Sequence, residues 1–130
     1  MRMFFNTSTQ ILVLSRKKAG GAVNHWGVQL PDGSVAHYRP DAGVVVTTVD
    51  RYADGQDVMV IREVPADRYR DVMERLRLAR AHPRHYDALN WNCQSFANWL
   101  TGEKAESPEA TGWVFVGALA LLVGIAARMG

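Results

Sequence analysis

The chain has 130 residues, of which 48% are apolar and 22% are charged, so we expect one globular domain with a modest core. A net charge of +2 is too small to predict a nucleic-acid partner, and the arginines between residues 62 and 84 alternate with acidic residues as on a solvated helix face. The single cysteine excludes an internal disulfide and is typical of a reducing compartment, so we expect a cytoplasmic protein. The first ten residues lack the apolar run of a signal peptide.

The first half of the chain alternates short apolar segments with turns, which is typical of an antiparallel sheet. Strands are predicted over residues 10–14, 23–30, 35–39, 44–49 and 57–64. A Pro-Asp-Gly-Ser turn joins the second and third of them, where Gly33 can take the positive φ of a tight hairpin. Residues 16–21 are predicted to be a basic, glycine-containing loop, and residues 54–55 a turn.

From residue 65 the apolar spacing changes to three and four, which predicts a helix over about residues 65–82. A second helix should begin near Cys93, because Asn90 and Asn92 precede it as capping side chains and Gly102 follows as a stop. Strands followed by helices indicate the α+β class, here a small antiparallel sheet packed on two helices.

The C-terminal segment is apolar. Residues 113–127 contain no charged or strongly polar side chain, but fifteen residues are fewer than the roughly 20 that a helix needs to span a bilayer. Either this helix packs on the domain, or it binds a membrane surface through residues 113–129. The predicted organisation is a domain over residues 1–102, a linker over 103–112 and an apolar helix over 113–130.

Cys93 is the candidate nucleophile. A cysteine in the first turn of a helix faces unpaired N–H groups and the positive end of the helix dipole, and both favour the thiolate. A thiolate of this kind can attack a carbonyl carbon if a base lies within reach. The alternative is that Cys93 is a small apolar core residue, as free cysteines often are.

Two of the four histidines are candidates for the base and its partner. His25 and His37 lie on the two strands of the predicted hairpin and can point to one face of the sheet. We expect the helix that carries Cys93 to pack across that face, with His25 as the base and His37 as the group that orients it. His82 and His85 are better explained by a helix end or a solvated loop. Zinc would need Cys93, both strand histidines and a fourth ligand without any supporting spacing, so no metal or cofactor is expected.

Both candidate segments match known motifs. Residues 25–37 read HWGVQLPDGSVAH, with an aromatic residue after the first histidine, an Asp-Gly turn and a second histidine twelve positions on. Residues 92–100 read NCQSFANWL, and Tyr86 precedes them. The two segments resemble the histidine box and the Asn-Cys-Glu-His-Phe motif of the lecithin–retinol acyltransferase-like proteins, with Gln94 and Ser95 in place of Glu-His. The resemblance covers about residues 8–102.

The resemblance implies a circularly permuted papain-like α+β fold and a thiol acyltransferase or phospholipase that acts on glycerophospholipids or retinol esters. By the same resemblance, Cys93 takes the acyl group, His25 is the general base and acid, and His37 is the third member of the triad. A membrane-anchoring C-terminal tail is also common in that family. Because the permuted fold includes peptidases, amidases and non-enzymes, a papain-like cysteine peptidase or amidase and a non-catalytic membrane-tethered binding module remain alternatives.

Overall fold

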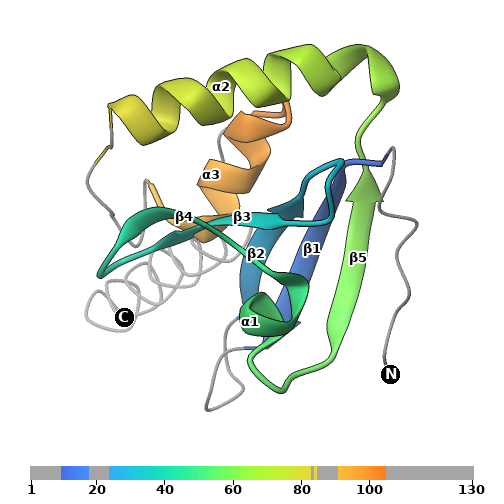
Figure 1. Cartoon of the computed structure of the whole chain (residues 1–130), viewed down its shortest axis with the longest axis vertical. Helices are drawn as coiled ribbons and strands as arrows, with labels where there is room; N and C mark the ends of the chain where they lie inside the picture. Colours follow the sequence, from blue (N-terminus) through green and yellow to red (C-terminus); the bar gives the residue numbers. More distant parts are fainter. Residues whose placement is uncertain (1–9, 18–23, 83, 85–90, 105–130) are drawn as a thin grey trace, which may run out of the picture.

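The structure is a computed structural model of the chain, and it describes residues 10–17, 24–82, 84 and 91–104. In these residues five strands form one antiparallel sheet of order β4-β3-β2-β1-β5 (Figure 1). The strands are β1 (Leu12–Lys17), β2 (Asn24–Gln29), β3 (Val35–Arg39), β4 (Gly43–Thr47) and β5 (Val58–Glu63). The helices are α1 (Val49–Ala53), a 3-10 turn η1 (Ala66–Arg68), α2 (Tyr69–Ala81) and α3 (Cys93–Leu100). The predicted α+β class is confirmed.

The hairpin between β2 and β3 forms as predicted. Gly33 has φ 87°, and its N–H donates to the carbonyl oxygen of Leu30 at 2.9 Å. The N–H of Leu30 donates in turn to the carbonyl oxygen of Ser34 at 2.8 Å, which closes the turn. This turn fixes the register in which His37 lies opposite Gly27. The position of the second histidine relative to β2 therefore follows from a tight local turn.

Two boundaries differ from the predicted ones. Arg16 and Lys17 belong to β1 and pair with β2, so the basic loop does not begin at residue 16. The strand predicted over residues 44–49 ends at Thr47, and Val49 begins the short helix α1. The reason is a cap: the hydroxyl of Thr48 accepts the backbone N–H of Arg51 and so favours a helical turn.

The sheet has two covered faces. On one face, α3 packs against β2 and β3, and α2 packs in turn against α3 (Figure 1). The buried residues of this face form the larger core: Ile11, Val13, Val28, Leu30, Ala36, Tyr38, Val64, Val72, Leu76, Trp91, Phe96, Ala97 and Leu100. The opposite face is covered by α1, whose Tyr52 packs with Leu12, Leu14, Val35 and Val58.

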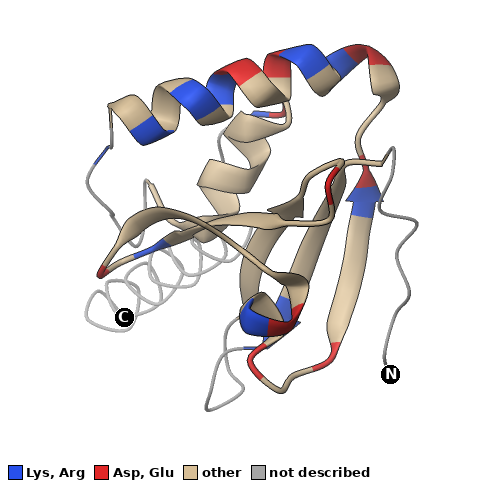
Figure 2. Cartoon of the chain, in the orientation of Figure 1, with Lys and Arg blue, Asp and Glu red and all other residues tan. Residues whose placement is uncertain are grey.

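The outer side of α2 is a mixed-charge surface. Figure 2 shows basic and acidic residues alternating along this helix. Glu74 and Arg77 form an exposed ion pair of 2.6 Å one turn apart. The prediction of a solvated helix face is confirmed for α2.

The expected C-terminal helix over residues 113–130, and the linker beyond Lys104, lie outside the described residues. None of the helices in the described part is long and apolar enough to cross a membrane.

Candidate active site

The two strand histidines contact each other directly. Nε2 of His25 lies 2.8 Å from Nδ1 of His37, and the two rings meet edge to face. Because His37 is paired with Gly27, and His25 precedes Gly27 by two residues, all three positions lie on the same face of the sheet. Each histidine has only 5% of its surface exposed. The prediction that the histidines share a face is confirmed.

The surroundings of His37 keep it neutral. Burial lowers the pKa of His37 to about 4, and the positive charges of Arg16 and Arg39 act in the same direction. A neutral His37 can accept a hydrogen bond at Nδ1 from the Nε2–H of His25. In that tautomer Nδ1 becomes the basic nitrogen of His25. The pair therefore has the arrangement that a general base and its orienting partner require.

Cys93 lies at the N-terminus of α3, as predicted. Oδ1 of Asn92 accepts the N–H groups of Gln94 and Ser95 at 2.9 and 3.1 Å, and the Ser95 hydroxyl accepts the N–H of Asn92 at 2.6 Å. This reciprocal capping box fixes where the helix starts. Asn90, the other expected cap, lies outside the described residues.

The sulfur of Cys93 lies beside the start of β2. The Cys93 side chain is buried, and Sγ is 3.9 Å from the carbonyl oxygen of Asn24, the residue directly before His25. Cys93 is also close enough to Tyr52 to help raise the pKa of that phenol, although burial is the larger cause and Arg16 opposes it. The three predicted residues thus gather around one end of β2.

The prediction that α3 packs across the histidine face is wrong. The α3 residues Phe96 and Ala97 pack in the same core as Ala36 and Tyr38. His37 lies between these two strand residues, so its side chain points to the opposite face. Only the N-terminal end of α3 reaches the backbone of β2 near His25. The reason is that successive side chains of a strand point to opposite faces of the sheet. Because Ala36 faces α3, the next residue, His37, faces away from it.

Tyr52 of α1 is a site residue that the sequence analysis missed. Its hydroxyl donates to the carbonyl oxygen of His25 at 2.6 Å, and its ring packs against the imidazoles of His25 and His37 at centroid distances of 5.7 and 5.4 Å. Burial raises the pKa of Tyr52, so the phenol stays protonated and remains a donor. The available signal was Thr48 followed by Asp50, which together are typical of a helix start.

Gly27 makes room for this tyrosine. A Cβ atom at position 27 would lie 2.7 Å from a ring carbon of Tyr52 and 2.8 Å from a methyl group of Val35. Both distances are shorter than carbon atoms tolerate. Because Gly27 has no side chain, α1 can pack directly on β2, next to the histidine pair.

A basic hollow of about 750 Å³ lies on the histidine side of the sheet. His25 and His37 line it together with Arg16, Arg39 and Arg51. A smaller apolar cavity of about 290 Å³ is lined by Tyr38, Trp91, Phe96 and Trp99, which belong to the other face. The two histidines thus border a polar, cationic space, and the apolar cavity lies on the helix side of the sheet.

The other candidates of the sequence analysis do not join the site. His82 follows the last residue of α2 as its cap, and His85 lies outside the described residues. Among the described residues, no group of three or more histidine, cysteine, aspartate or glutamate side chains is placed to hold a metal ion.

No protein-family model matches this chain, and neither a curated protein nor a solved structure is significantly similar to it. The resemblance to the lecithin–retinol acyltransferase-like proteins therefore depends on the two sequence motifs alone.

Proposed function

We propose that this protein is a thiol acyltransferase or phospholipase-type acyl hydrolase with a permuted papain-like fold. Cys93 is the nucleophile, His25 the general base and acid, and His37 the third member of the triad. The observation that carries the proposal is the 2.8 Å contact between the two imidazoles, next to the capped helix start that bears the cysteine. The substrate is an acyl ester presented at a membrane surface, to which residues 113–129 would attach the protein.

The reaction follows from these positions. Nδ1 of His25 takes the thiol proton of Cys93, and the thiolate attacks the ester carbonyl carbon. The tetrahedral intermediate collapses to an acyl thioester while the imidazolium of His25 protonates the departing alcohol oxygen. Water or an acceptor amine then attacks the thioester with His25 as base, which releases the acyl group and restores the thiol.

Two contacts support this sequence of steps. Nδ1 of His37 accepts from Nε2–H of His25 and so stabilises the imidazolium, which requires a His37 that stays neutral. The oxyanion would be held by the backbone N–H of Cys93 at the start of α3, where the positive end of the helix dipole also favours negative charge. The hydrogen bond from Tyr52 holds the backbone of His25 in place.

The test is release of fatty acid from phosphatidylcholine vesicles. We expect the wild type to release it, and Cys93→Ala and His25→Ala to lose at least a hundredfold in rate, because removal of the nucleophile or base affects every turnover. His82→Ala is the matched control, since this histidine caps the end of α2 and does not line the hollow beside His25 and His37, and it should keep the wild-type rate.

An amide with the same acyl group distinguishes the ester reaction from that of a peptidase or amidase. Faster cleavage of the amide would contradict the lipid substrate. Equal traces of fatty acid from the wild type, Cys93→Ala and His25→Ala would contradict catalysis, and a binding module would then explain the fold.

A further inference from the structure

We propose that the basic hollow beside the histidine pair is a binding site for the phosphate of an anionic phospholipid. This inference rests on the proposed function and specifies the substrate: a lipid whose headgroup carries a phosphate without a neighbouring ammonium group. Arg16, Arg39 and Arg51 form the site.

The three arginines come from separate elements and meet at one place. Arg16 lies on β1, Arg39 ends β3, and Arg51 lies on α1, yet all three line the hollow that His25 and His37 also line. The charges of Arg16 and Arg39 both act on His37, which places the two guanidinium groups near that imidazole. Guanidinium groups bind phosphate oxygens with paired N–H donors, so three that converge predict a phosphate ligand.

One of the three is held rigidly. The Nε–H of Arg16 donates to the carbonyl oxygen of Tyr52, and its guanidinium lies over the Tyr52 ring, 5.6 Å from the centroid. Another N–H of Arg16 donates to the carbonyl oxygen of Lys17 at 3.2 Å. A guanidinium fixed in this way loses little side-chain entropy when an anion binds.

The acidic residues of the hollow do not cancel its charge. Asp41 and Asp54 are the two carboxylates in the lining, against three arginines and neutral His37. Asp41 pairs with Arg39 at 2.9 Å, but both side chains are about half exposed or more. Exposed ion pairs of this kind are weak, so a phosphate can displace the Asp41 carboxylate.

The position of the hollow links the anion to the reaction. His25 lines the hollow and is also the proposed base, and in a glycerophospholipid only a few bonds separate the phosphate from the ester carbonyl. A zwitterionic headgroup would bring its ammonium group toward the same arginines, and like charges at this range are unfavourable. A neutral ester would leave the guanidinium groups without an anion. We therefore expect selection for the anionic headgroup.

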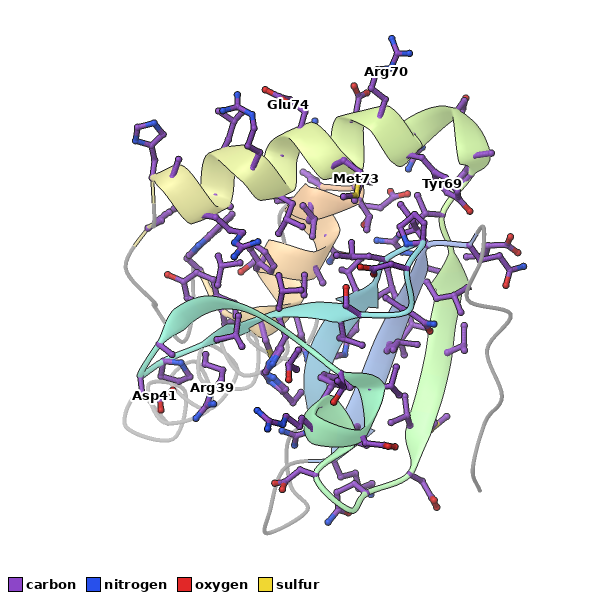
Figure 3. The ribbon with its side chains drawn as sticks, viewed as in Figure 1. Arg39, Asp41, Tyr69, Arg70, Met73 and Glu74 are labelled. Atoms are coloured by element: carbon purple, nitrogen blue, oxygen red, sulfur yellow. The ribbon has the colours of Figure 1, made fainter. Side chains whose placement is uncertain are left out.

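The experiment compares three monomeric substrates with the same short acyl chains: a phosphatidylglycerol, a phosphatidylcholine and a diacylglycerol. For the wild-type chain, kcat/KM should be about tenfold higher for the phosphatidylglycerol than for the other two substrates. Arg51→Gln and Arg39→Gln should each reduce this ratio at least threefold. Arg70→Gln is the matched control, because Arg70 projects outward from α2, away from Arg39 and Asp41, and should leave the ratio unchanged (Figure 3).

A further variant is expected to raise the preference for the anionic substrate, where the arginine variants lower it. Asp41→Asn removes the carboxylate that competes for Arg39, so it should raise the preference for the anionic substrate about threefold. A structural defect at the β3–β4 hairpin would lower activity on all three substrates together and could not produce this gain. An unchanged or reduced preference in Asp41→Asn would overturn the site.

Binding to Cys93→Ala protein separates this inference from the proposed reaction. By titration calorimetry, the short-chain phosphatidylglycerol should bind the Cys93→Ala protein at least tenfold more tightly than the phosphatidylcholine does. In the double variant that carries both Cys93→Ala and Arg51→Gln, the two lipids should bind equally. Inorganic phosphate should compete, and a lipid that binds no better than inorganic phosphate would contradict headgroup recognition. Arginine-dependent binding without hydrolysis by the wild type would preserve the site and refute the acyl-transfer function. Equal binding of both lipids would refute the site, whatever the wild type hydrolyses.

Discussion

The protonation of His37 is decided by its neighbours. The ring is buried, and Arg16 and Arg39 add positive charge beside it, so the pKa falls to about 4. An isolated strand histidine would titrate near pH 6.5. The charged residues around the site therefore keep the hydrogen-bond acceptor of the pair intact throughout the neutral range.

This shift predicts a pH dependence of stability. Between about pH 6.5 and 4 the unfolded chain binds a proton at His37 that the folded chain does not, so stability falls as the pH decreases through this range. At about 1.4 kcal/mol per pH unit, we expect His37 to account for a loss of roughly 2 kcal/mol between pH 7 and pH 5, measured by urea unfolding.

His37→Asn is the matched variant for this measurement, because its amide oxygen can still accept from His25 but cannot titrate. Between pH 7 and pH 5, the free energy of unfolding of the variant should fall by about 2 kcal/mol less than that of the wild type. His25 and the two arginines are common to both proteins. If the variant and the wild type lose stability equally, the lowered pKa of His37 is refuted.

At the scale of elements, α3 is fixed at both ends by polar groups. Its first turn is capped by Asn92 and Ser95. Near its last turn, Arg75 donates to the carbonyl oxygen of Trp99, and Arg68 donates to that of Thr101 at 3.3 Å. Cations at the C-terminal end of a helix are stabilising because they face its negative pole. These contacts hold the helix in the position that brings Cys93 to β2.

The contact between α1 and β2 depends on the missing side chain at Gly27. We expect Gly27→Ala to reduce the free energy of unfolding by about 1–3 kcal/mol, because the added methyl group collides with the Tyr52 ring and with Val35. Thermal or urea unfolding gives the value. In Tyr52→Ala protein the same substitution should cost less, since one of the two collisions is gone. If the stability losses of Gly27→Ala and Tyr52→Ala are additive in the double variant, the proposed collision between positions 27 and 52 is contradicted.

At the scale of the molecule, the sheet separates the larger core from the candidate site. The helices α2 and α3 and the aromatic core stabilise one face, and the other face carries the histidine pair, α1 and the basic hollow. The strands β4 and β5 are the edges of the sheet within the described residues. A membrane-bound substrate would approach the basic face, which fits the proposed preference for anionic lipids.

The C-terminal segment gives the prediction at this scale. We expect the full chain to float with phosphatidylcholine vesicles in a density gradient, and a chain without residues 112–130 to stay at the bottom, because the deleted residues carry the apolar run. The circular dichroism spectrum and unfolding midpoint of the shortened chain serve as the control for folding. A shortened chain that remains folded and floats as well as the full chain would disprove the anchor.

The sequence by itself determined the elements that depend on local rules. The Asp-Gly turn set the β2–β3 hairpin and put His25 and His37 on one face, and the side chain of Asn92 set the start of α3. Local hydrogen bonds and a two-residue period suffice for these features. The short helix α1 was missed because five residues are too few to show a helical period.

Only the tertiary structure decided what surrounds the histidines. Arg16 reaches the site from β1, and the neighbouring residues Arg51 and Tyr52 reach it from α1, more than thirty positions later in the chain. The face on which α3 packs was likewise set by which strand residues could be buried together, and this choice left the histidines on the opposite side. Such contacts join residues far apart in the chain, so they appear only when the sheet, α1 and α3 are assembled around a common core.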